Sequence, residues 1–278
     1  MYEVVNSRFH EFLKKPQKKK LLVGGGGSGK SVSICQYMCI GLLSGDGYRR
    51  LILRKYFPSF KKSTLVLIKA ILDDWHVAYK HHATDHYFQV GNNYLVYDSL
   101  DQSEKVKGSE YKEIWMEEAT DFTEDDYKQL TIRLARDKNS EDTTLILSFN
   151  PIDQNNFCVK LLDEAAKYPN EYAVMHSTYK DNIKNLSKSF VRELKSYKDK
   201  DPNFYNVYAL GIPGKLENQI FTNFIIDDAR KWPWPKLNSG LHCYGLDFGF
   251  NHPMSLCEVF YADGEFYARE LFYKSGCT

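Results

Sequence analysis

A glycine-rich segment near the N-terminus has the residue types and the spacing that hold a phosphate group. Its eight residues fit the pattern G-x-x-x-x-G-K-[ST] and stand between an apolar run at 21–23 and a helical pattern at 31–43. Glycines let the backbone wrap a phosphate and turn several N–H groups inward, and the positive end of the following helix adds to the attraction. The residues are Gly24, Gly25, Gly26, Gly27, Ser28, Gly29, Lys30 and Ser31.

The last two residues of this segment have separate expected roles. We expect Lys30 to reach the β- and γ-phosphates of a nucleotide, and the hydroxyl of Ser31 to ligate Mg²⁺. The alternative is a flexible glycine loop that binds nothing. The strand-to-helix context, which this motif requires, favours the phosphate site.

Two adjacent carboxylates follow the apolar run 114–116, which we expect to be a buried strand. Ligand sites of parallel sheets lie at the carboxyl ends of the strands, so Glu117 and Glu118 should face the glycine loop. Adjacent residues of an extended segment point in different directions. We therefore expect Glu117 in the Mg²⁺ shell and Glu118 beside the attacking water, as a general base or orienting group. An acidic helix cap before Ala119 is the alternative.

A second apolar run, 145–149, also ends in polar groups. Ser148 and Asn150 are two residues apart and so lie on the same face of a strand. Both can sense phosphate or water and relay the state of a nucleotide. A turn signalled by Asn150 and Pro151 is the alternative.

Several cations are candidates to complete the charge of a phosphate site, in cis or from a neighbouring subunit. Arg54 ends the predicted strand 51–53 on the crevice side. Most basic residues on such a surface are merely solvated. The other candidates are Lys105, Lys107, Arg133 and Arg136.

An isolated acid occurs far from the glycine loop, where Asp247 lies among apolar residues with Gly245 and Gly249 on either side. A charge among apolar neighbours is costly unless it is paired or metal-bound. One explanation is a nuclease carboxylate that holds Mg²⁺ or Mn²⁺, and two-metal cleavage needs several such groups. A satisfied structural aspartate is the other explanation.

The elements that must position these residues alternate between strands and helices. From residue 20 short apolar runs alternate with helical patterns, including one expected from Pro58 through about Tyr79, and a hairpin is expected at 91–93. This alternation predicts an α/β fold with a mostly parallel sheet covered on both faces. After the Pro- and Gly-rich stretch beyond residue 200, runs at 241–248, 255–260 and 266–272 predict an antiparallel β unit.

Composition excludes several classes of protein. The chain has 278 residues, 43% hydrophobic and 26% charged, which is ordinary globular usage and excludes a disordered or fibrous chain. Lys+Arg 37 against Asp+Glu 36 leaves a net charge of +1, so any nucleic acid must be held by a local patch. No C-x-x-C pair occurs among the six cysteines, and no apolar run approaches the length of a membrane span.

Five segments, taken together and in this order, resemble the large terminase subunit of tailed bacteriophages, in particular its PBSX-like branch. They are the glycine loop 24–31, Ile-Trp-Met-Glu-Glu-Ala at 114–119, Ser-Phe-Asn-Pro at 148–151, Ser-Thr-Tyr-Lys-Asp-Asn at 177–182 and Gly-Leu-Asp-Phe-Gly at 245–249. The resemblance covers essentially the whole chain. It implies a P-loop NTPase domain of the additional-strand, catalytic-glutamate type that pumps DNA, followed by an RNase H-like nuclease domain that cuts DNA with two metals.

The resemblance also implies roles for single residues. Lys30 and Ser31 match the Walker A residues, Glu117 and Glu118 match the Walker B acid and the catalytic glutamate, 148–150 match the coupling motif, and Asp247 matches the first nuclease carboxylate. The Walker B acid is usually an aspartate.

This chain departs from its relatives at two further positions. Many relatives carry an arginine where this chain has Gly26, for which Arg54 is a candidate to compensate. Relatives often place another arginine before the acidic strand, where this chain offers Lys105 and Lys107.

The domain organisation and the partners follow from the same resemblance. We expect an ATPase domain over 1–215, a linker over 216–240 and the incomplete beginning of the nuclease domain over 241–278. The expected cofactors are ATP and Mg²⁺, with Mg²⁺ or Mn²⁺ at the nuclease site of a complete chain. The expected partners are double-stranded viral DNA, the portal protein, the small terminase subunit and further copies in a homo-oligomeric ring, in the host cytoplasm and without a membrane.

Two other functions fit parts of the sequence. A helicase-like, DNA-stimulated ATPase needs a second motor domain, for which the residues after 215 leave no room. A nucleotide-regulated binding module without turnover does not need a second acid at the strand end, so Glu118 argues against it.

Overall fold

The chain divides into two compact units, Met1–Glu217 and Asn218–Thr278. The computed structural model describes residues 4–45, 47–100, 111–136, 143–214, 225, 227–248 and 254–274, without the side chains of Ser59 and of 133–136. The candidate cations Lys105 and Lys107 therefore lie outside the described residues, as do the side chains of Arg133 and Arg136.

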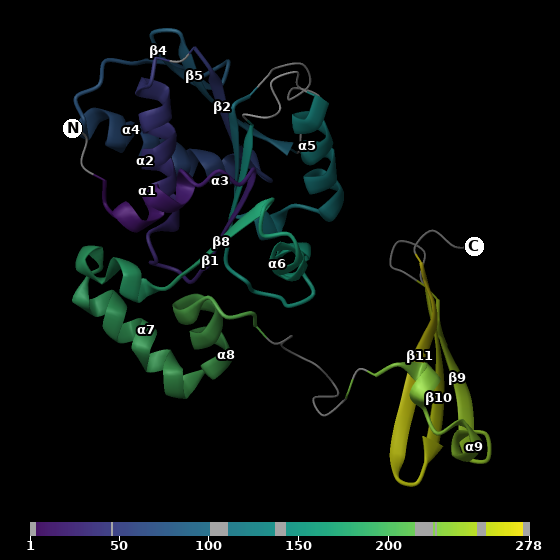
Figure 1. Ribbon diagram of the computed structural model, residues 1–278. Coiled ribbons are helices and arrows are strands. Elements are labelled where there is room, and N and C mark those ends of the chain that lie inside the picture. Colours follow the sequence, from purple (N-terminus) through teal and green to yellow (C-terminus); the bar gives the residue numbers. More distant parts are fainter. Residues whose placement is uncertain are drawn as a thin grey trace. The chain divides into compact units, whose positions relative to one another are not determined.

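The first unit alternates strands and helices along the chain (Figure 1). Its strands are β1 (Lys19–Gly24), β2 (Arg49–Arg54), β3 (Lys80–His82), β4 (Tyr87–Val90), β5 (Asn93–Ser99), β6 (Glu113–Glu117), β7 (Thr144–Phe149) and β8 (Tyr172–Ser177). Its helices up to β8 are α1 (Ser7–Leu13), α2 (Lys30–Leu43), α3 (Phe57–Lys62), α4 (Thr64–Asp74), η2 (Ala119–Asp121), α5 (Glu124–Arg136) and α6 (Phe157–Lys167).

The eight strands form one sheet in the order β3-β4-β5-β2-β6-β7-β1-β8. All pairs from β5 to β8 are parallel, whereas β4 runs antiparallel to both β3 and β5. Strand β7 lies between β1, which leads into the glycine loop, and β6, which ends at Glu117, the first residue of the acidic pair. The predicted mostly parallel sheet of the additional-strand type is confirmed, and the structure adds the position of that strand, β7, between β1 and β6.

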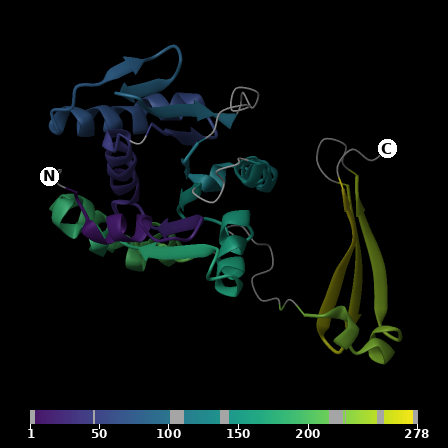
Figure 2. The same cartoon turned by 45° about the horizontal axis from the view of Figure 1, so that its top comes forward.

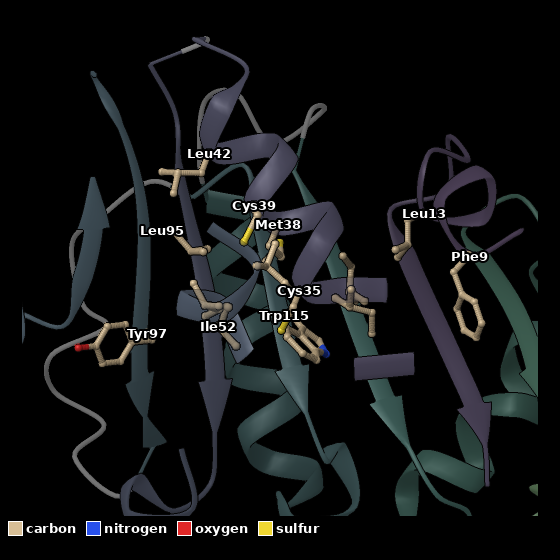
Figure 3. Packing of buried hydrophobic residues seen from close by; sticks show 14 of the residues in the cluster. Phe9, Leu13, Cys35, Met38, Cys39, Leu42, Ile52, Leu95, Tyr97 and Trp115 are labelled. Carbon is tan, nitrogen blue, oxygen red and sulfur yellow. The ribbon is translucent and has the colours of Figure 1, made fainter. Parts of the chain in front are cut away.

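Helices cover both faces of this sheet, as Figure 1 and Figure 2 show. Apolar side chains of α1, α2 and α4 share one buried cluster with Leu22, Ile52 and Trp115, and Figure 3 shows Cys35, Met38 and Cys39 of α2 facing the strands. Side chains of α5 and α6 share a second cluster with the alternate strand residues. The central strands are buried on both sides, which is why they read as continuous apolar runs.

The structure corrects the helix expected from Pro58 to Tyr79. Ser63 has φ −126° and ψ −81°, outside the helical region, and separates α3 from α4, which ends at Asp74. The hairpin expected at 91–93 does form, between β4 and β5, with Gly91 at a positive φ of 56°. Within the described ranges every helix is too short or too polar to span a bilayer.

The segment that follows β8 packs onto the glycine loop. It consists of η4 (Tyr179–Asn185), α7 (Lys188–Lys200), the short helix α8 (Pro202–Phe204) and a π-helical turn, η5 (Tyr205–Leu210). Tyr179, Leu194 and Ala209 form its own small core. We call residues 179–210 the cover segment.

The second unit is a three-stranded antiparallel sheet in the order β11-β10-β9. The strands are β9 (Leu241–Asp247), β10 (Met254–Ala262) and β11 (Glu265–Lys274), preceded by η6 (Ala229–Lys231) and α9 (Trp234–Leu237). Trp234 packs edge-on against Phe260, so part of the range expected as a linker packs on this sheet. The assignment of 241–278 as the beginning of a nuclease domain stays a prediction.

Candidate nucleotide-binding site

The glycine loop connects the end of β1 to the first turn of α2, which begins at Lys30. Gly27 and Gly29 have φ values of 73° and 88°, in the left-handed region that side chains with a Cβ rarely adopt. The backbone therefore turns twice within the loop before the helix starts. The strand-loop-helix context that the motif requires is present.

The ammonium group of Lys30 is buried inside the loop itself. Its Nζ lies 2.7 Å from the carbonyl oxygen of Gly24, 3.0 Å from that of Gly25 and 3.2 Å from Oγ of Ser28. Burial lowers the pKa of Lys30 to about 8, and the negative charge of Glu118 acts in the opposite direction. To reach a nucleotide, this side chain has to exchange the loop carbonyls for phosphate oxygens.

Glu118 does not continue the strand, which corrects the premise that the two acids share an extended backbone. Strand β6 ends at Glu117, and Glu118 has a φ of 51° and a ψ of 57°. This left-handed turn separates the two carboxylates by a change of chain direction. Burial raises the pKa of the Glu118 carboxyl, with Lys30 acting against the rise. A carboxylate with a raised pKa is the better proton acceptor near neutral pH.

Glu117 is 3% exposed and is held by two hydrogen-bond donors. Arg54 Nε lies 2.9 Å from its Oε2, and the hydroxyl of Thr64 donates to the same oxygen. Arg54 thus ends β2 beside Glu117, the last residue of β6. Its place in a nucleotide crevice and its contact with phosphate stay predictions. Thr64 was missed by sequence reasoning because it falls inside a predicted helix, 53 residues away in the chain.

The two residues after the apolar part of β7 differ in what they touch. Asn150 Oδ1 lies 3.1 Å from Nζ of Lys30, so this side chain reaches the glycine loop. Ser148 is buried, and its hydroxyl accepts a hydrogen bond of 2.9 Å from the indole N–H of Trp115. Of the two, Asn150 has the direct contact with a residue of the glycine loop.

The cover segment and the end of β8 close tightly on the glycine loop. Asn182 Nδ2 donates to the carbonyl oxygen of Gly27 at 2.9 Å, and the N–H of Gly25 donates to the carbonyl of Ser177 at 3.3 Å. A Cβ on Gly25 would lie 2.3 Å from the carbonyl oxygen of Tyr208. No contact with the loop was predicted for Ser177, Asn182 or Tyr208, although 177–182 is one of the segments that carry the resemblance.

The donor set at this site suits a magnesium ion that arrives with a nucleotide. Ser31 stands in the first turn of α2, and Glu117 offers a buried carboxylate. In the part of the chain that the structure describes, no three His, Cys, Asp or Glu side chains are grouped as a metal site. Mg²⁺ usually takes one or two protein ligands, and phosphates and water complete its shell.

Asp247 lies in the other unit, as the last residue of β9. Its side chain is exposed, and in the sheet it stands opposite Ser255 of β10. Among the described residues, it is not part of a group of three or more His, Cys, Asp or Glu side chains that could hold a metal ion. Its role as a metal ligand stays a prediction.

Comparison with known protein families settles the relationship of the chain. A family model described as phage terminase large subunit matches residues 16–212, which contain the glycine loop, the acidic pair and Asn150. The chain belongs to this family. The family expected from the five sequence segments is thereby confirmed, and no curated protein sequence matches this terminase chain.

Solved structures of terminases share the fold at low sequence identity. The large terminase of a thermophilic bacteriophage matches with a TM-score of 0.61 and 18% identity, over 93% of this chain and 64% of that one. The HK97 bacteriophage large terminase matches with a TM-score of 0.59 and 13% identity, over 92% and 59%. The ATPase domain of the Thermus phage P74-26 large terminase matches with a TM-score of 0.51 and 13% identity, over 72% and 90%. This chain thus spans less than two thirds of the first two relatives.

Proposed function

We propose that the chain is the ATP-hydrolysing motor subunit that translocates double-stranded DNA into a viral procapsid. The observation that carries the proposal is the convergence of an amide and a buried acid on the lysine of the glycine loop. Lys30 bonds Asn150 and lies within the electrostatic influence of Glu118, while Glu117 is the last residue of strand β6 of the same sheet. The large terminase of the thermophilic bacteriophage has been solved with ADP and with ATP-gamma-S, which supports a nucleotide at the matching loop.

Each residue of the site has a separate proposed role in ATP hydrolysis. Lys30 leaves the loop carbonyls and neutralises the β- and γ-phosphates, which the loop N–H groups and the α2 N-terminus also bind. Glu118 orients the attacking water and accepts its proton. Ser31 and Glu117 would hold Mg²⁺, which when bound neutralises charge on the phosphate oxygens. Asn150 senses the phosphates through its bond with Lys30.

Further charge at the transition state comes from a neighbouring copy of the chain. Arg54 is engaged with Glu117, so its guanidinium is anchored at the metal side of the site. Among the candidate cations, Lys105 and Lys107 precede the acidic strand, and Arg133 and Arg136 lie on the next helix. A cation supplied in trans implies a homo-oligomeric ring and weak hydrolysis by isolated chains.

The remaining expectations concern partners and the second unit. We propose viral DNA, the portal protein and the small terminase subunit as partners of the assembled ring in the host cytoplasm. We also propose that Asp247 is one metal-binding carboxylate of a nuclease domain that would use Mg²⁺ or Mn²⁺.

Nucleotide binding to Lys30→Ala tests the proposal at its first step. Loss of the ammonium group should abolish tight ATP binding, because it faces the phosphates. Calorimetry with ATPγS measures this, and Lys18→Ala is the matched control, since Lys18 is exposed outside the loop. Unchanged affinity in Lys30→Ala would contradict the proposal.

A further inference from the structure

The metal-side acid Glu117 is fixed by donors from two other elements of the fold. Arg54, the last residue of β2, donates from Nε to Oε2 at 2.9 Å. Thr64, the first residue of α4, donates its hydroxyl to the same oxygen. Thr64 is 1% exposed, so this hydroxyl has no access to bulk water.

Both bonds engage one oxygen of the carboxylate and leave the other available. Among the described side chains none donates a hydrogen bond to Oε1 of Glu117. A carboxylate that is anchored through Oε2 presents Oε1 in a fixed direction. Groups that hydrogen-bond a metal ligand in this way set its orientation and tune its affinity for the ion.

The position of Thr64 depends on the break between α3 and α4. Ser63 leaves the helical region, and this starts a new helix whose first side chain is directed at the end of β6. Helix α4 is then fixed by Ile68 and Leu72, which are fully buried in the same cluster as Cys35 of α2. The hydroxyl therefore sits on a rigid element that packs beside the helix bearing Ser31.

We propose that Thr64 is a positioning residue for the metal-binding acid Glu117. It holds Oε2 so that Oε1 faces the ion or its water shell, while Arg54 supplies the compensating charge. The inference rests on the proposed function, because it takes Glu117 as part of the Mg²⁺ site. It adds a residue from an element that contains none of the expected nucleotide-binding residues.

The test measures ATPγS binding by calorimetry over a range of Mg²⁺ concentrations, and again with a chelator. Thr64→Val removes the hydroxyl and keeps the shape, so the Mg²⁺ concentration for half-maximal binding should rise about 10- to 100-fold. Binding without Mg²⁺ should be unchanged, since Lys30 and the loop are intact. Thr64→Ser, which keeps the hydroxyl, should restore the wild-type Mg²⁺ dependence.

Thr143→Val is the matched control for the loss of a buried threonine hydroxyl. Thr143 is 5% exposed and precedes β7, at the opposite end of the strands from Glu117. It should leave the Mg²⁺ dependence at the wild-type value. If Thr64→Val does not fold, Thr64→Cys replaces it, because a thiol is a weak donor and should also raise the Mg²⁺ requirement.

The outcomes separate this inference from the function on which it rests. A wild-type chain that binds ATPγS equally with and without Mg²⁺ would remove the proposed role of Glu117, and the inference with it. If ATPγS binding by the wild type depends on Mg²⁺ and Thr64→Val shows the same Mg²⁺ dependence, the role of Thr64 is overturned and the proposed function stands. Equal weakening of binding with and without Mg²⁺ would also overturn it, since that marks a structural role of Thr64.

Discussion

The ammonium nitrogen of Lys30 lies 3.1 Å from the amide oxygen of Asn150, which joins the glycine loop to the end of β7. Two segments separated by 120 residues are thus linked at the point where a phosphate would bind. The same ammonium also bonds the carbonyls of Gly24 and Gly25. If it moves from these carbonyls to a phosphate, its bond with Asn150 has to change as well. The contact therefore connects occupancy of the loop to the sheet.

The first prediction compares two substitutions of Asn150. Asn150→Asp places a carboxylate beside Lys30, and a charged hydrogen bond would hold the ammonium by about 1.5–3 kcal/mol. ATPγS binding should weaken by a similar free energy, whereas Asn150→Ala should bind at least as well as the wild type. Calorimetry measures both, and the idea fails if the alanine variant is the weaker binder.

The second prediction concerns the fit between the glycine loop and the cover segment. A Cβ on Gly25 would lie 2.3 Å from the Tyr208 carbonyl oxygen, whereas the nearest atom to a Cβ on Gly26 is at 3.8 Å. Gly25→Ala should lower the free energy of unfolding by about 1–3 kcal/mol, as overpacking does, and should weaken nucleotide binding. Gly26→Ala should have little effect on the free energy of unfolding. Denaturant titration measures the free energy of unfolding of both variants. An equal loss in Gly25→Ala and Gly26→Ala would contradict the described packing.

The third prediction tests the separate role of the metal-side acid. Glu117→Gln removes a charge from the Mg²⁺ site and should raise the Mg²⁺ concentration needed for hydrolysis. The Arg54 guanidinium, 2.9 Å from the carboxylate, would also lose its ionic partner in a buried place. Steady-state rates over a Mg²⁺ titration measure the change. If Glu117→Gln and the wild type require the same Mg²⁺ concentration, Glu117 does not contribute to the Mg²⁺ site.

The fourth prediction is that this 278-residue chain does not cut DNA with Mg²⁺ or Mn²⁺. Two-metal cleavage needs several ligands to hold ions about 3.5–4 Å apart, and the described residues contain no group of three or more His, Cys, Asp or Glu side chains that could hold a metal ion. Incubation of plasmid with the purified chain and each metal measures nicking. Cleavage by the wild type that is lost in Asp247→Ala would mean that the chain supplies further metal ligands besides Asp247.

The sequence predicted those parts of the site that depend on local pattern. The glycine loop needs a strand before it and a helix after it, and both are visible in the hydrophobic periodicity. The central strands read as apolar runs because both of their faces are buried, so the acidic pair could be placed at the end of one of them. No order of the strands was predicted, because the order depends on contacts between segments that are far apart in the chain.

Other parts depend on tertiary contacts that no local pattern contains. The helical periodicity of 58–79 hides the break at Ser63, and with it the bond from Thr64 to Glu117. The positive φ of Glu118 likewise contradicts the preference of a glutamate, so only the folded structure reveals it. Ser148 was expected to sense the nucleotide because its strand position is right, yet its hydroxyl bonds the Trp115 indole.

The most direct test of the account is single-turnover hydrolysis of ATP by the wild-type chain and by Glu118→Gln, with protein in excess over nucleotide. An amide cannot accept the proton, so the variant should bind ATPγS as the wild type does and hydrolyse ATP about 10²–10⁴-fold more slowly. Lys18→Ala, a substitution of an exposed residue outside the glycine loop, is the control and should hydrolyse ATP at the wild-type rate. Equal rates in the wild type and in Glu118→Gln, or no turnover by the wild type with DNA present, would contradict the proposed ATPase.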